Sequence, residues 1–375
     1  MHNERFVAGE PAAAFGNMGT GLTSPNCGHD ASWDQYPFVS VLVLNWNGQR
    51  YLRECFNSLR FNSCPHVEVV LIDNGSQDES VDFTRGEFPN VRIIRHSKNL
   101  GFCQGYNLGV DAVHGAFLVF LNNDTVVEKG WLEPLIGCLR AESDVAIATS
   151  KILFVGSRIV NMAGGILKLW TGAADIGYGR HESWLERPGA IEPFYGSGAA
   201  MAMRRDLFQL VGGFDKDYFA YGEDLDLSWR LRLIGYRVRL VRESVVHHHH
   251  SGTLGLFNPR KVRLVTRNHL STLIKCLALH NALHAIPAYA SFALIKGVAL
   301  SIVRRDASFL LAIVLSIKDV VVGFRPLLGR RRETQLLRRV TDAEALRSEQ
   351  SGLITSPREW VRILSVARSC AGSRS

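Results

Sequence analysis

Three carboxylates in one short stretch of the chain could supply a general base. Glu223, Asp224 and Asp226 follow an aromatic run at 218–221 and precede a segment with apolar residues at helical spacing. Acids in the first turn of a helix are also stabilised by the helix dipole, which is a purely structural reason for their presence. That reason does not explain the aromatic run, which could form the wall of a sugar pocket. The stretch therefore predicts proton abstraction from a hydroxyl group.

Polar side chains also recur where apolar runs end. Runs at 39–44, 67–72, 91–94 and 116–121 predict buried strands, and carboxylates or carboxamides follow them: Asn45, Asp73, Asn74, Asp78, Asn99, Asn122 and Asp124. In open α/β sheets, ligands bind at the carboxyl ends of the strands, so this clustering predicts a nucleotide site. Local turn preferences of Asn, Asp and Gly are the structural alternative.

No glycine-rich phosphate motif accompanies these residues. Neither G-x-x-x-x-G-K-[ST] nor G-x-G-x-x-G occurs, so hydrolysis by a P-loop and dinucleotide redox chemistry lose their main support. A divalent cation is another way to hold a diphosphate, because Mg²⁺ and Mn²⁺ bridge phosphate oxygens with only one or two protein carboxylates. Asp124 could provide such a carboxylate.

Four consecutive histidines at 247–250 follow a strand-like stretch at 237–241. An imidazole from this run could add a metal ligand. Side chains alternate between the two faces of a strand, so at most two of the four histidines can face one site. A structural role in the core is the alternative for each of them.

Strand-like and helical segments alternate from residue 39 onward, which predicts a parallel sheet with crossover helices. Residues 1–36 lack this pattern, and we expect them to form a flexible extension. They also lack the basic start and the apolar core of a secretory signal.

Composition restricts the class of protein. The 375 residues include 43 Lys and Arg against 35 Asp and Glu, giving a net charge of +8, and 46% of the chain is hydrophobic. This composition supports a packed core and excludes a disordered or collagen-like chain. The seven cysteines are scattered and form no C-x-x-C pair, which favours a reducing, cytoplasmic setting over a disulfide framework.

The region 276–375 differs from the rest. Apolar runs at 285–303 and 307–324 approach the length that spans a bilayer, but internal charges, Pro287 and the break at 304–306 favour interfacial helices or a hairpin. Six arginines between Arg325 and Arg339 are opposed by Glu333 alone. This cluster predicts contact with the anionic inner face of the cell membrane and not with nucleic acid. A solvated helix face, a packing lid and a homodimer surface are the alternatives.

Five motifs occur in a fixed order before the histidine run. They are D-N-x-S-x-D at 73–78, N-x-G-F at 99–102, L-N-x-D at 121–124, G-G-F-D at 212–215 and E-D-x-D-L-x-x-R at 223–230. This order resembles the inverting nucleotide-sugar glycosyltransferases of family 2, especially their rhamnosyltransferase-like branch, over roughly residues 38–275. The resemblance implies the GT-A fold, an α/β architecture with a mixed sheet flanked by helices.

The resemblance also implies roles for individual residues. Asp124 resembles the metal-binding acid of a D-x-D motif, although the first position of the motif is Asn122 here, so fewer charges hold the metal. The residues implied on the donor side, at the nucleoside or the pocket edge, are Asn45, Asp73, Asn74, Asp78, Asn99, Gly101, Asn122 and Asp124.

On the catalytic side, Asp224 resembles the general base, with Glu223 beside it and with Asp226 and Tyr221 on the acceptor side. We expect His248 to ligate Mg²⁺ or Mn²⁺, judged from its spacing to the Ser-Gly-Thr sequence at 251–253, with His249 as the second choice.

The sequence therefore predicts a metal-dependent inverting glycosyltransferase domain at 37–275 and a membrane-associated helical region at 276–375. The donor would be a nucleoside diphosphate sugar, with rhamnose as the sugar that the resemblance favours, and the acceptor a lipid-linked or cell-envelope glycan. The processive polymerases fit poorly, because no Q-x-x-R-W motif occurs. A non-catalytic module that binds sugar nucleotides or glycans on the same fold is the competing hypothesis, and the intact acids at 124, 223 and 224 speak against it.

Overall fold

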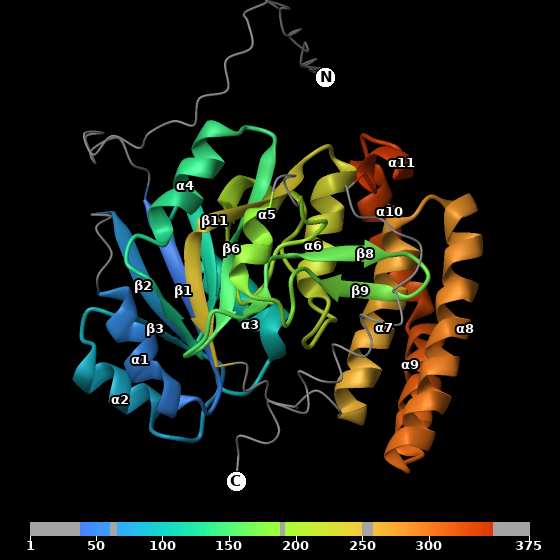
Figure 1. The fold of residues 1–375 in the computed structure, drawn as a ribbon, viewed down its shortest axis with the longest axis horizontal. Coiled ribbons are helices and arrows are strands. Elements are labelled where there is room, and N and C mark those ends of the chain that lie inside the picture. The colour runs from blue at the N-terminus through green and yellow to red at the C-terminus, as the bar shows by residue number, and fades with distance from the viewer. Residues whose placement is uncertain (1–37, 61–65, 188–191, 250–257, 348–375) are drawn as a thin grey trace, which may run out of the picture. The chain divides into compact units, whose positions relative to one another are not determined.

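A mixed sheet flanked by helices forms the centre of the protein (Figure 1). The computed structural model describes residues 38–60, 66–187, 192–249 and 258–347, within one compact unit. The sheet has the strand order β3-β2-β1-β4-β10-β6-β11-β5, and β7 pairs with β6. Its strands are β1 (Val39–Asn45), β2 (Val67–Asp73), β3 (Arg92–Arg95), β4 (Phe117–Asn122), β5 (Thr125–Val127), β6 (Val145–Phe154), β7 (Val160–Met162), β10 (Ala200–Arg204) and β11 (Arg237–His248). This architecture confirms the predicted fold class.

Helices α1 to α6 lie between strands along the chain, and α7 to α11 follow the last strand. They are α1 (Gln49–Leu59), α2 (Ser80–Glu87), α3 (Gly101–Asp111), α4 (Leu132–Ala141), α5 (Arg205–Leu210), α6 (Glu223–Leu233), α7 (Pro259–Cys276), α8 (Leu279–Arg304), α9 (Ser308–Val322), α10 (Phe324–Leu337) and α11 (Asp342–Ala345). A separate hairpin joins β8 (Gly165–Lys168) to β9 (Gly172–Asp175), and a 3₁₀ helix spans Glu182–Glu186.

The register of the parallel strands places the predicted polar residues at one edge of the sheet. Strand β1 lies parallel to both β2 and β4, so that Asn45 is opposite Asp73 and Leu44 is opposite Asn122. Strand β10 runs antiparallel to β4 and β6, which makes the sheet mixed. Because β1, β2 and β4 are parallel and in register, their carboxyl ends lie side by side, and the polar residues at these ends come together.

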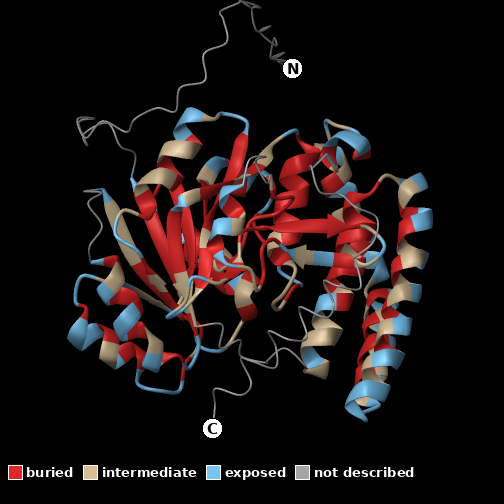
Figure 2. Cartoon of the chain, viewed as in Figure 1, coloured by how far each residue is buried: buried red, intermediate tan, exposed pale blue. Residues whose placement is uncertain are grey.

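Two hydrophobic clusters hold the helices to this sheet and to each other. In the first, side chains of α3, α5 and α6 pack against β1, β2, β4 and β10, with Tyr106 and Phe120 fully buried. In the second, Trp229 and Leu233 of α6 pack with residues of α7 to α11. The central strands β1, β4, β6 and β10 are almost wholly buried in Figure 2, whereas α8 and α9 alternate between buried and exposed positions. The C-terminal helices therefore share a core with α6.

Helices α8 and α9 correspond to the two predicted apolar runs and pack side by side (Figure 1). In the described part of the chain, α8 alone is long and apolar enough to cross a membrane, and only 17% of its most apolar window is buried. Ile302 and Val303 at its end are 70% and 75% exposed. This is weak support for membrane association.

The arginines of 325–339 do not form one exposed cluster, which corrects the expectation that they face lipid together. Arg330 pairs with Asp215 at 2.7 Å and also with Asp217. Arg331 donates to the Leu277 carbonyl at 2.7 Å, and Arg338 pairs with Asp342 at 2.7 Å. The exposed members are Arg325, Arg332 and Arg339.

Candidate functional site

The ends of β1, β2 and β4 form a cluster of neutral amides around one buried carboxylate, which we call the strand-end cluster (Asn45, Asp73, Asn74, Ser76 and Asn123). Asn45 donates to Ser76 at 3.2 Å and accepts from Asn123 at 2.6 Å. Asp73 is completely buried, and its Oδ2 accepts the Ser76 amide at 3.2 Å. Its Oδ1 has no partner among the described residues. This oxygen is an unsatisfied hydrogen-bond acceptor at the ends of the strands.

A second layer of amides shapes the neighbouring turn. Asn74 donates to Asn99 at 3.1 Å and to the Gly101 carbonyl at 3.0 Å. Gly101 has a φ of +81°, and a Cβ atom there would collide with the Phe219 carbonyl, so only glycine fits. This close approach joins the turn to the aromatic run at 218–221, because the Phe102 amide donates to Phe219 at 2.6 Å.

Asp78 lies at the surface and is occupied by the backbone. Its Oδ1 accepts the Ser80 amide at 3.1 Å, and its Oδ2 accepts the Gln49 amide at 3.1 Å. The structure therefore gives Asp78 a role in joining two loops, next to the predicted nucleoside residues.

The histidine run pairs each of its described members with a different acid. His247 Nε2 lies 2.9 Å from Glu128, His248 Nε2 lies 3.0 Å from Asp124 Oδ1, and His249 Nε2 lies 2.9 Å from Glu54. The structure thus brings the two predicted metal ligands together from β11 and the end of β4. His250 and residues 251–253 lie outside the described residues.

The Asp124 and His248 pair is compatible with a hard divalent cation. Asp124 is 8% exposed, and the His249 amide donates to its backbone carbonyl at 3.0 Å, which fixes β11 against the 122–124 turn. Adjacent ligands of an octahedral ion with bonds of about 2.1 Å lie about 3 Å apart, which matches the observed separation. In the described residues, no group of three or more His, Cys, Asp or Glu side chains surrounds a possible metal position. Such a cation would need further oxygen ligands from elsewhere.

Glu223 and Asp224 open helix α6 in different environments. Asp224 is partly exposed, and its Oδ2 accepts the Gly198 amide at 3.2 Å. Burial raises the pKa of Asp224 to about 6. Burial, helped by the neighbouring Asp224 charge, raises the pKa of Glu223 to about 8, and Glu223 Oε2 is buried without a partner in the described structure. Burial thus favours the neutral form of both acids, and it does so more strongly for Glu223 than for Asp224.

A short loop connects this pair to the metal side of the site. The Asn122 amide donates to the Ala199 carbonyl at 3.0 Å, while the adjacent Gly198 amide holds Asp224. The turn at 198–199 thus links Asn122 to Asp224, about a hundred positions apart in the sequence.

Tyr221 and Asp226 were both predicted on the acceptor side, and the structure separates them. Tyr221 is partly exposed in a left-handed conformation, with a φ of +70°, and Asn268 donates to its carbonyl at 2.7 Å. Asp226 is completely buried, 2.6 Å from Lys275 and 2.8 Å from Arg230. Asp226 therefore cannot contact an acceptor, and this placement corrects the prediction for it.

Sequence reasoning missed a charge network around the loop that precedes α6, in which Asp215, Asp226 and Lys275 are buried. Lys275 of α7 pairs with both Asp226 and Asp215, and Arg330 of α10 pairs with Asp215 and Asp217. We call these five residues the charge clamp. Asp215 belongs to the G-G-F-D motif, but no spacing rule in the sequence relates it to a lysine 60 positions away or to an arginine 115 positions away.

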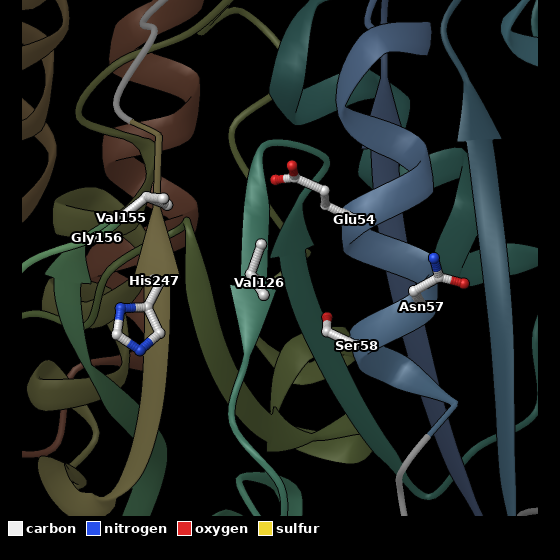
Figure 3. A pocket seen from close by; sticks show the side chains of 7 residues that line it. All are labelled: Glu54, Asn57, Ser58, Val126, Val155, Gly156 and His247. Atoms are coloured by element: carbon white, nitrogen blue, oxygen red, sulfur yellow. The ribbon is translucent and has the colours of Figure 1, made fainter.

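A hollow of about 510 Å³ lies elsewhere, between α1, β5 and β11. Figure 3 shows Glu54, Asn57 and Ser58 of α1 across from Val126 and His247. None of its lining residues belongs to the predicted donor, metal or base residues.

Comparisons with known proteins bear on the family and the fold of the chain. The model of glycosyl transferase family 2 matches residues 40–210, and that of glycosyl transferase family 21 matches residues 194–331. The pre-mycofactocin glycosyltransferase of Mycobacterium tuberculosis is 28% identical over 60% of this chain and 45% of its own length. The O-antigen biosynthesis protein RfbC of Myxococcus xanthus is 26% identical over 58% of this chain and 18% of its own length. The chain thus spans less than half the length of either relative.

Among solved structures, GalNAc-T7 with UDP, GalNAc and Mn²⁺ superposes with a TM-score of 0.55 at 16% identity, covering 78% of this chain and 59% of that one. At this identity, the likeness concerns the fold. The matched family models and the relatives agree with the resemblance to the family 2 glycosyltransferases, and the solved structure agrees with the fold that this resemblance implies.

Proposed function

We propose that this protein is a metal-dependent, inverting glycosyltransferase that moves one sugar from a nucleoside diphosphate to a hydroxyl group. The observation that carries the proposal is the turn at 197–199, which holds Asp224 at one end and the 122–124 turn at the other. Single displacement needs a base for the acceptor hydroxyl and a carboxylate that holds the metal at the diphosphate. The turn at 197–199 fixes the position of Asp224, the base, relative to Asp124, the carboxylate.

The strand-end cluster would bind the nucleoside. The unpartnered oxygen of buried Asp73 suits an N–H donor of a nucleobase, while Asn45, Asn74 and Asn99 hold the surrounding turns. Asp78 and Gly101 would keep these turns in place and shape the edge of the pocket.

Asp124 and His248 would hold Mg²⁺ or Mn²⁺, and Asn122 would line the same turn. When bound, the cation supplies Lewis acidity to the oxygens of the departing diphosphate. Mn²⁺ accompanies UDP in the structurally similar GalNAc-T7, which supports a divalent metal without distinguishing the two ions.

Asp224 would accept the proton of the acceptor hydroxyl as that oxygen attacks the anomeric carbon from the face opposite the diphosphate. The new glycosidic bond forms as the bond to the diphosphate oxygen breaks, so the anomeric configuration inverts. The raised pKa of Glu223 favours its neutral form, which would avoid a second negative charge next to the base.

The acceptor would be a lipid-linked or cell-envelope glycan, and rhamnose is the donor sugar that the motif order favours. The exposed apolar end of α8 and the adjacent exposed Arg304 and Arg305 support contact of the α8–α9 hairpin with an anionic membrane. The RfbC relative, named for O-antigen biosynthesis, supports an envelope product. A homodimer through the same face is the competing explanation for its exposed apolar residues.

A donor screen tests the activity. Purified protein is incubated with a panel of nucleoside diphosphate sugars, with Mn²⁺ or with EDTA, and thermal unfolding is followed, because a bound donor stabilises the folded state. The stabilising donor is then tested for transfer, and the product anomer is assigned by NMR. We expect stabilisation by one nucleotide class in the presence of Mn²⁺ and an inverted product. A retained configuration, or transfer unchanged in excess EDTA, would overturn the proposal.

A further inference from the structure

Both ring nitrogens of His248 have a partner. Nε2 lies 3.0 Å from Asp124 Oδ1, and Nδ1 lies 3.0 Å from Oδ1 of Asn161. Asn161 is 5% exposed and sits in the short strand β7, which folds back antiparallel on β6. Strand β7 therefore brings an amide to the side of the imidazole that faces away from Asp124.

The nature of the Asn161 atom decides the form of the imidazole. With the carbonyl oxygen of Asn161 facing the ring, Nδ1 donates the hydrogen bond between them. In the neutral ring, the lone pair then lies on Nε2, which faces the carboxylate of Asp124. Either a proton on Nε2 or a cation ligated by both atoms accounts for the 3.0 Å separation between Nε2 and Asp124 Oδ1.

We propose that Asn161 is a positioning residue for the metal: it selects the tautomer of His248 with the proton on Nδ1 and turns Nε2 toward the cation beside Asp124. This inference rests on the proposed function, in which Asp124 and His248 hold that cation. Groups that accept from the far nitrogen of a ligating histidine fix the ring and raise its basicity, and losing them typically lowers metal affinity by about 10- to 100-fold.

The neighbouring histidine provides an internal comparison. His247 precedes His248 in β11, and its Nε2 bonds to Glu128, but its Nδ1 is buried without a partner in the described residues. His247 thus pairs with an acid and lacks the acceptor that orients His248. If a histidine of β11 needs an acceptor on Nδ1 to ligate the metal, His247 is not a ligand. Substitution of His247 should then leave metal binding intact.

The test measures Mn²⁺ binding to the full chain without any donor, by following the EPR signal of free Mn²⁺ during titration. Asn161→Leu removes the acceptor at similar volume, and Asn161→Asp keeps it. We expect Asn161→Leu to weaken Mn²⁺ binding by about 10- to 100-fold, and Asn161→Asp to bind within a few-fold of the original or more tightly. His247→Gln is the matched control and should bind as the original does. Thermal unfolding of each variant checks that it is folded, and Asn161→Ala replaces the leucine variant if that one does not fold.

The outcomes separate this inference from the proposed function. If His248→Ala abolishes Mn²⁺ binding while Asn161→Leu binds normally, the metal site stands and the role of Asn161 is overturned. Equal weakening by the leucine and aspartate variants also overturns it, because the acceptor would then not matter. If the original protein does not bind Mn²⁺, or if His248→Ala binds as well as the original, the proposed metal site itself fails.

Discussion

The strand-end cluster and the charge clamp both hold parts of one site, by different interactions. Most bonds of the strand-end cluster join neutral side chains, such as Asn45 to Asn123 at 2.6 Å, and its single carboxylate, Asp73, lies 3.6 Å from Arg95. The charge clamp uses buried ions from helices distant in sequence, such as Lys275 to Asp226 at 2.6 Å. Replacing one side chain should therefore cost less stability in the strand-end cluster, where most bonds are neutral, than in the charge clamp, where it leaves a buried charge without its partner.

The charge clamp gives the C-terminal helices a structural role in the catalytic domain. Arg330 reaches Asp215 from α10, and the core around Trp229 continues into α7 to α11. A chain ending near residue 276 would lose Arg330 and leave that core open to water. We therefore expect such a truncated protein to aggregate, although the sequence alone suggested a separable catalytic domain.

The largest effect should come from Asp224→Asn. Loss of the base should lower kcat by about 10²- to 10⁴-fold, while donor affinity stays close to the original, because the strand-end cluster is unchanged. Steady-state kinetics and calorimetric titration of the donor measure the two quantities. Glu223→Gln is the control, since a neutral amide imitates the protonated acid and should cost much less at neutral pH. A larger loss in Glu223→Gln would move the base to Glu223.

Lys275→Met should strongly destabilise the protein, because it leaves Asp226 and Asp215 with less compensation in the core. Breaking a buried ion pair in this way costs about 3 to 5 kcal/mol of unfolding free energy. Asn74→Ala, which removes neutral bonds from the strand-end cluster, should cost about 1 to 3 kcal/mol. Urea denaturation of both variants makes the comparison. Equal losses would mean that the two regions are held equally firmly.

The pH dependence should depend on the base side alone. Because burial raises the pKa of Asp224 to about 6, Asp224 is protonated below that pH and cannot accept a proton, so kcat/KM should fall as the pH drops through 6. The charge of Asp175 contributes to the raised pKa of Asp224, so Asp175→Asn should shift this limb to lower pH. Asp144→Asn, at a surface ion pair with Arg237, is the control and should leave the limb in place. An unshifted limb in Asp175→Asn would argue against this electrostatic coupling.

The two regions also differ in how far the sequence could predict them. Asn45, Asp73 and Asn122 each follow an apolar strand directly, and parallel pairing brings such strand ends together, so the pattern predicted that they would meet. Asp226 shares a motif with Asp224, but it lies two residues further along α6, on roughly the opposite face of the helix, where it meets Lys275 and Arg230. The sequence placed Arg330 and Arg331 in a basic surface cluster, but both side chains bind groups of the protein itself. A count of charges along the chain does not show which charges pair in space.

The smallest effect should be on membrane binding, and it should differ between an arginine exposed to solvent and one that binds the protein itself. Arg305 lies exposed at the end of α8, whereas Arg331 donates to the carbonyl of Leu277. An arginine near anionic lipid contributes about 1 kcal/mol, so Arg305→Gln should weaken binding to vesicles of phosphatidylcholine and phosphatidylserine by about five-fold. Arg331→Gln should leave vesicle binding unchanged, although it removes the same charge, because its side chain points into the protein. Sedimentation at low and high salt measures both variants. If both lose binding equally, net charge alone attracts the protein to lipid, and if neither the original nor the variants sediment, the apolar face of α8 and α9 belongs to a protein interface.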